Sequence, residues 1–191
     1  NIASATLPNS DQIIAAYGVV QRLILIGSYM VMGFMQGYQP VASYAFGGKM
    51  VDRFHSSVRF ALKGSLLISF VVEVFYLIFS KPLIAAFNNN PQIISYGRML
   101  LFSQMVLFPA FGLCYMMTIT YQTIGESGYG LFLSTIRQGI LYVPLILVLP
   151  RIFSFMGICL SQPIADVLTI IICMLSVKKM KRIASKSMEK Q

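Results

Sequence analysis

Long apolar runs, separated by short polar segments, dominate the hydrophobic pattern of the chain. Two of these runs, 23–48 and 99–125, contain no charged residue at all. A stretch of about 18 or more apolar residues is long enough to cross a bilayer as a helix. The pattern therefore predicts five membrane-spanning helices, and these cover residues 13–46, 60–79, 93–121, 130–149 and 155–177.

The composition supports an all-α polytopic membrane protein. Of the 191 residues, 57% are hydrophobic and 11% are charged, whereas soluble domains average about 45–50% apolar and about 25% charged residues. The net charge of +9 is compatible with nucleic-acid binding, but the cations gather in the connections and at the C-terminus, beside apolar runs. That distribution is typical of a membrane protein, so we expect no nucleic-acid partner.

The placement of the cations predicts the orientation in the membrane. Four of them lie in the connection 47–63, and more lie in the tail 178–191, whereas the other side carries Lys81, Arg98 and Arg151. With five alternating spans, the connection and the tail fall on the same side. Because basic loops face the cytoplasm, we expect a plasma (inner) membrane protein with a cytoplasmic C-terminus. We also expect the chain, 1–191, to be part of a longer polypeptide with helices upstream.

Arg137 and Asp166 each lie alone inside an apolar run. Ionisable residues within membrane spans are costly and mark functional or pairing sites by default. Spans 130–149 and 155–177 form an antiparallel hairpin that turns near Ile152, and both residues lie roughly 21–23 Å from this turn at 1.5 Å per residue. Their matching depth makes an ion pair possible. Such a pair is either a structural clasp or a charged pair that lines a cavity and rearranges.

Other polar groups carry weaker signals. Glu73 lies inside the span 60–79, where it is either a proton site or an interfacial carboxylate that pairs with Arg98; Asp166 is a second candidate proton site. The three cysteines have no metal-ligand spacing, and no hydrolase, metalloprotease or nucleotide-binding motif is present. We therefore expect no enzyme, no catalytic residue, no metal site and no cofactor other than a coupling ion.

Prolines interrupt four of the five predicted spans. Gln39-Pro40 and Gln162-Pro163 repeat one dipeptide, and Pro109 and Pro144 lie in two further spans. Broken helices often border transport sites, although a static kink in a packed bundle is the alternative. The pair Gly33 and Gly37 has the spacing of a close helix–helix contact.

Three segments together resemble the C-terminal half of MATE (multidrug and toxic compound extrusion) transporters, in the bacterial multidrug-exporter branch. They are 15–49, 121–150 and 157–172, and their most specific parts are GYQPVASYAFGGK, RQGILYVPLILVLP and SQPIAD. The resemblance implies helices eight to twelve of a twelve-helix fold, without the seventh helix and the N-terminal bundle. The motif positions are expected to shape a substrate cavity or a conformational switch, and they are Gln39, Pro40, Arg137, Gln138, Pro144, Gln162, Pro163 and Asp166.

The resemblance also implies a function. MATE transporters exchange external Na⁺ or H⁺ for cationic, amphipathic drugs by alternating access, so we expect part of a multidrug efflux antiporter. Some branches place coupling carboxylates on helices seven and ten, but the span 93–121 has no acidic residue, which puts coupling through this half in doubt. The alternatives are a lipid-linked oligosaccharide flippase of the same superfamily and a non-transporting membrane subunit.

Overall fold

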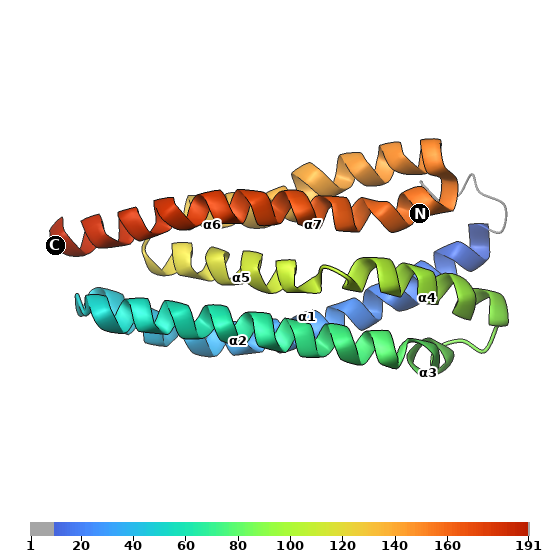
Figure 1. The fold of residues 1–191 in the computed structure, drawn as a ribbon, viewed down its shortest axis with the longest axis horizontal. Helices are drawn as coiled ribbons and strands as arrows, with labels where there is room; N and C mark the ends of the chain where they lie inside the picture. Colours follow the sequence, from blue (N-terminus) through green and yellow to red (C-terminus); the bar gives the residue numbers. More distant parts are fainter. Residues whose placement is uncertain (1–9, 191) are drawn as a thin grey trace.

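The chain folds into an elongated bundle of antiparallel helices (Figure 1). The computed structural model describes residues 10–190, without the side chains of residues 10, 138, 178, 179, 181 and 184–190. All its regular elements are helical, and in chain order they are α1 (Ser10–Gly47), α2 (Val51–Ile78), α3 (Ser80–Ala85), α4 (Pro91–Met105), α5 (Phe108–Thr123), α6 (Ser127–Thr135), the π-helix η1 (Ile136–Leu141) and α7 (Tyr142–Lys190). The prediction of an all-α polytopic membrane protein is confirmed.

The long helices have the length and apolarity of membrane spans. Asp11–Gly47, Val51–Ile78 and Ser127–Val177 each meet that description, and α4 with α5 makes a further, bent pair. The stretch Ser127–Val177 holds 51 residues, which at 1.5 Å per residue is far longer than a hydrocarbon core of about 30 Å. Figure 1 shows why: the chain reverses direction within α7, so this stretch passes along the bundle twice.

The reversal in α7 occurs at Ser154, two residues after the expected turn at Ile152. Ser154 has φ 50° and ψ −130° and is the one non-helical residue in α7. A positive φ is uncommon for residues other than glycine, so this backbone is held by its surroundings. Gly157 contributes to the turn, because a Cβ there would meet the backbone of Leu149 and Pro150.

Several helix bounds differ from the predicted spans. Helix α2 begins at Val51, so most of the segment 47–59 is helical rather than an irregular connection. Helix α7 continues to Lys190, so the basic tail extends the last span as a helix. In both segments the apolar run marks only the part of a helix that is hydrophobic, because a helix does not need to end where a membrane does.

Prolines act differently in different helices. The predicted span 93–121 is divided into α4 and α5, which meet at an angle of 46°, and Pro109 lies in the first turn of α5. There it has no hydrogen bond to lose, because the first helical amides have no partner. Pro40 and Pro163 lie inside α1 and α7, and both helices continue past them. A bend at Pro40, as the sequence suggests, is therefore not accompanied by a break.

Small residues bring α1, α2 and α5 together. A Cβ at Gly27 would lie 2.8 Å from Val72, one at Gly64 would collide with the Phe34 ring, and one at Gly112 would lie 2.9 Å from the Ser65 carbonyl. Close approach of this kind is how membrane helices gain packing energy. The expected contact at Gly33 and Gly37 is wrong for the described residues, since neither has another helix within 4 Å.

The basic segments lie at the same end of the bundle. The turn between α1 and α2, the turn between α5 and α6 and the C-terminal part of α7 share the left end in Figure 1, and the start of α1, helix α3 and the α7 reversal share the other. The arrangement follows from antiparallel neighbours joined by short turns. It places Lys49 and Arg53 at the end where the chain terminates.

Candidate functional site

A π-helix carries one half of the buried ion pair. Residues Ile136–Leu141 form η1 between α6 and α7, and Arg137 is its second residue. Pro144 gives a reason for the wider turn, because it has no N–H and its ring clashes with the carbonyl four residues earlier, that of Ile140. Single π-helical turns inside longer helices often lie at functional sites.

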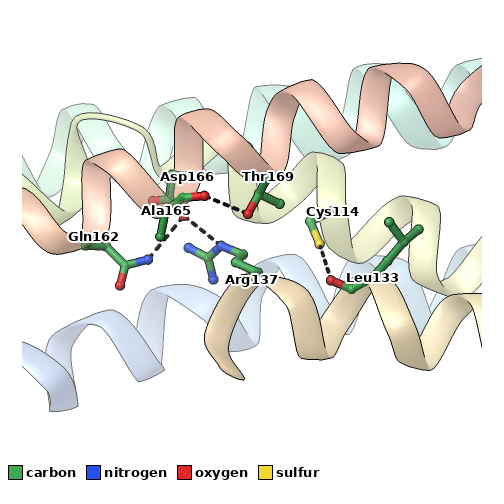
Figure 2. Close-up of polar contacts among 7 residues, drawn as sticks. All are labelled: Cys114, Leu133, Arg137, Gln162, Ala165, Asp166 and Thr169. Atoms are coloured by element: carbon green, nitrogen blue, oxygen red, sulfur yellow. Dashed lines mark hydrogen bonds and ion pairs between the residues drawn. The ribbon is translucent and has the colours of Figure 1, made fainter. Parts of the chain in front are cut away.

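Arg137 and Asp166 form an ion pair between η1 and α7. The Nε atom of Arg137 donates to Oδ1 of Asp166 at 2.8 Å, and the exposed fractions of the two side chains are 10% and 1% (Figure 2). The contact that the matching depths make possible is therefore present. A charge-assisted hydrogen bond is about twice as strong as a neutral one, and it offsets part of the cost of burying two ions.

Gln162 joins the pair one helical turn before Asp166. Its Nε2 donates to the same Oδ1 atom at 3.1 Å. Nearby hydroxyls are used within α7 itself, since Thr169 donates to the Ala165 carbonyl at 2.7 Å and Ser161 to the Gly157 carbonyl at 2.6 Å. The Oδ2 atom of Asp166 is buried and has no hydrogen-bond partner among the described residues. The carboxylate is thus bound at one oxygen and unsatisfied at the other.

The guanidinium of Arg137 also lies over an aromatic ring. Its Cζ is 5.2 Å from the centroid of Phe111, within the range of a cation–π interaction. Phe111 is the middle member of a row on α5: its ring is 5.6 Å from that of Phe108 and 5.8 Å from that of Tyr115, with interplanar angles of 24° and 19°. The row presents nearly parallel ring faces beside the ion pair.

A cavity of about 400 Å³ opens next to Arg137, between α1, α5 and the α6–η1 segment. Ten residues line it, and Arg137 is the charged one among them, together with three aromatic residues, three small hydroxyl residues and three apolar ones: Tyr29, Phe111, Tyr115, Ser28, Thr118, Ser134, Leu25, Met32 and Cys114. Asp166 does not line this cavity. The positive member of the ion pair therefore faces the cavity, and the negative member lies behind it.

The other expected site residues are divided between this site and elsewhere. Pro144 and Pro163 adjoin the pair along the chain, while Gln138 lies in η1 with a side chain outside the described part. Gln39 is half-buried and Pro40 exposed on α1. Gln39 follows Met32, the last cavity residue on α1, by seven residues, or about 10 Å along a helix. The structure thus does not bring Gln39 and Pro40 to the Arg137 site.

Glu73 lies apart from the ion pair. It is half-buried near the α3 end of α2. Within the described residues, its carboxylate has no ion pair with Arg98, the partner suggested by the sequence. Its role as a proton site stays a prediction.

Two components of the site escaped the sequence reasoning. The π-helix was missed, although Gly139 and Pro144, five residues apart in one apolar run, were a signal of a disturbed helix. The cavity was also missed as a location, although Phe108, Phe111 and Tyr115 have helical spacing that places them on one face.

Comparison with known sequences identifies matches in one family. The family model described as MatE matches residues 2–148. The multidrug export protein MepA of Staphylococcus haemolyticus is 25% identical over 164 residues, which is 86% of this chain and 36% of the relative. MepA of Staphylococcus saprophyticus is 26% identical over 164 residues, with the same coverage. The chain thus spans about a third of the length of the curated relatives that it matches.

Solved structures show the same fold. The MATE transporter DinF-BH, determined with a drug bound, superposes with a TM-score of 0.81 at 28% identity, over 92% of this chain and 40% of that one. The Vibrio cholerae transporter VcmN in its bent form gives a TM-score of 0.82 at 17% identity, over 91% and 40%. A MATE structure in complex with MaL6 gives 0.85 at 17% identity, over 93% and 41%. These coverages are those of a partial transporter bundle.

Proposed function

The chain belongs to the MATE family, and we propose that it forms part of a multidrug efflux antiporter. The relatives that it resembles are multidrug export proteins, and the DinF-BH structure, at 28% identity, was determined with a drug bound. In this proposal the complete protein exchanges H⁺ or Na⁺ for amphipathic drugs, cationic ones included, by alternating access. The chain contributes a C-terminal bundle that packs against an N-terminal bundle of the same polypeptide.

The observation that carries this proposal is the ion pair of Arg137 and Asp166 beside an open cavity. A charged pair between membrane helices has at least two arrangements, paired and separated, and a transport cycle needs such alternatives. Oδ2 of Asp166 is free to accept a new donor, and η1 is a helix segment that a small backbone shift converts into an α-helix. A scaffold subunit has no use for a half-satisfied pair of this kind.

Drug protection in cells tests the export function. Cells that lack their own pumps should survive dyes and fluoroquinolones better when they express the full-length protein. Protection should be lost with Asp166→Asn and retained with Ser43→Ala, which changes an exposed residue of α1. No protection across a broad panel would remove the drug-efflux proposal.

Labelling with a membrane-impermeant thiol reagent tests whether water reaches the pair. The three native cysteines are replaced, and single cysteines are placed at positions 137, 162 and 166. We expect at least one of them to react in one transport state and to be protected in the other. Leu175→Cys, at a position that is 73% exposed on the outside of the bundle, is the lipid-facing control. If all three positions stay unlabelled in every state, a non-transporting subunit explains the protein better.

Coupling and orientation follow as further parts of the proposal. Asp166 and Glu73 are the candidate proton sites, so uptake into inverted vesicles under a pH gradient or a Na⁺ gradient should be compared for Asp166→Asn and Glu73→Gln. A variant that uncouples drug movement from its gradient identifies the site. The basic end of the bundle is assigned to the cytoplasm of the plasma (inner) membrane, which a C-terminal fluorescent protein fusion tests, because it fluoresces only on the cytoplasmic side.

A further inference from the structure

We infer that the cavity beside Arg137 binds the acidic end of a flat aromatic ligand, such as an aromatic carboxylate. This inference rests on the proposed export function and narrows the substrate class at this site. It differs from the expectation of purely cationic drugs. An amphipath that carries both a cation and an aromatic acid fits both.

The first step is the charge that the cavity presents. Arg137 lines it and Asp166 does not. A ligand that enters therefore meets a guanidinium group, with the compensating carboxylate behind it. Because Coulomb interactions strengthen as the surroundings become less polar, a bound cation would be repelled there and an anion attracted.

The second step is the set of free donors on Arg137. Its Nε is bonded to Asp166, but neither terminal nitrogen makes a hydrogen bond with any residue that the structure describes. Figure 2 shows a dashed line at one guanidinium nitrogen and none at the other two. The side chain is 10% exposed, so these donors are buried within the bundle apart from their opening to the cavity. Two parallel N–H groups match the geometry of a carboxylate.

The third step is the shape of the walls. The rings of Phe111 and Tyr115 are nearly parallel, with an interplanar angle of 19°, and Tyr29 adds a third ring to the lining. Flat aromatic ligands bind well against such faces. The volume of about 400 Å³ lies within the range of about 300–1,000 Å³ that is usual for drug-sized ligands. A ligand of two or three fused rings with one carboxylate satisfies both the walls and the donors.

Three probes that share one ring system test the inference. We propose to measure binding of 2-naphthoate, 2-naphthamide and 2-naphthylmethylammonium to the full-length protein in nanodiscs, with empty nanodiscs subtracted for partitioning into lipid. Naphthoate should bind about tenfold more tightly than the amide, because charge-assisted hydrogen bonds replace neutral ones. The ammonium probe should bind most weakly. Equal affinities, or tighter binding of the ammonium probe, would overturn the inference.

Variants then locate the binding. Arg137→Gln should remove the preference for naphthoate over the amide, whereas Asp166→Asn should strengthen naphthoate binding several-fold, because the competing carboxylate is gone. A purely structural role of the pair predicts no such rise, so an unchanged or weaker naphthoate affinity in Asp166→Asn contradicts the inference. This second variant decides the matter if Arg137→Gln fails to fold.

A cavity-filling pair provides the matched control. Ser28→Phe places a ring in the cavity and should weaken all three probes, whereas Ser43→Phe makes the same change at an exposed position of α1 outside it. If the two variants bind naphthoate equally, the binding lies elsewhere and the inference is wrong. The same preparations are assayed for export of a cationic dye. Dye export without naphthoate selectivity removes only this inference, and naphthoate selectivity without any export removes only the transport proposal.

Discussion

The contact between α2 and α5 and the contact between η1 and α7 join helices by opposite means. At the first, Gly112 lets the backbones approach closely beside Ser65 and Ser69. At the second, the buried ions Arg137 and Asp166 meet through one hydrogen bond and leave other polar atoms unsatisfied. Close packing of small residues has one good arrangement, because atoms either fit or collide. A half-satisfied ion pair has several, and the comparison therefore assigns rigidity to the first contact and mobility to the second.

Removal of one charge should produce the largest effect. In Asp166→Leu, Arg137 remains buried without its partner, and we expect a loss of about 3–5 kcal/mol in the free energy of unfolding. Unfolding can be followed with a thiol-reactive fluorophore, because Cys114, Cys159 and Cys173 are free and buried. Thr169→Val, one turn away, is the control and should cost less than about 1 kcal/mol, since its hydroxyl bonds within its own helix. Equal losses in both variants would show that the charge is not special.

The packed contact should fail in the opposite way, through excess volume. Gly112→Val forces side-chain atoms into the Ser65 backbone and the Ser69 hydroxyl, and we expect a loss of about 1–3 kcal/mol. Gly33→Ala is the matched control, because nothing lies within 4 Å of the added carbon. It should be neutral or stabilise by up to about 1 kcal/mol. The comparison breaks if Gly33→Ala is the more damaging change in the same thermal assay.

The sequence was a good guide to elements whose cause is local. The apolar runs placed the membrane helices, and the equal distances of Arg137 and Asp166 from a turn predicted that they meet. Closeness between helices was predicted badly, because Gly33 and Gly37 have the right spacing but no neighbour, whereas Gly112 has no motif and a tight contact with α2. A glycine packs closely only if another helix lies opposite, and that depends on the whole bundle.

Backbone irregularities were also hard to predict. Pro109 and Pro163 look alike in sequence, yet the first begins a helix and the second lies within one. Pro144 follows a π-helix, which depends on how η1 is held between α6 and α7 and on the ion pair that fixes Arg137. The cavity likewise arises from three separate segments and has no signature in any one of them.

The π-helix offers a test in which export and stability should separate. Pro144→Ala restores an N–H that can bond to Ile140, and it also makes the unfolded chain more flexible by about 0.4–1 kcal/mol. Because a new hydrogen bond is worth about 0.5–1.5 kcal/mol, stability should change by less than about 1 kcal/mol. Export should nevertheless fall, since a regular α-helix turns Arg137 away from its present position. Unchanged dye export would mean that the π-helix has no role in the cycle.

The smallest expected effect concerns a neutral hydrogen bond at the edge of the mobile segment. The hydroxyls of Tyr17 and Tyr142 lie 2.8 Å apart and join α1 to the first turn of α7. Tyr17→Phe should cost about 0.6 kcal/mol, the average for such bonds between membrane helices. Tyr44→Phe, at a position 68% exposed, should cost nothing measurable. A loss above about 3 kcal/mol for Tyr17→Phe would place a rigid joint where we expect a movable one.

A double-mutant cycle between positions 137 and 166 tests the central claim most directly. The variants Arg137→Met and Asp166→Leu are measured singly and together, for both the free energy of unfolding and drug export. We predict a coupling energy of at least about 1 kcal/mol and a double variant more stable than either single one, since two neutral side chains replace a buried pair. Export should be lost in all three. If the two losses in stability add within about 0.3–0.5 kcal/mol, or if the double variant exports drugs normally, the pair is not the functional element of this bundle.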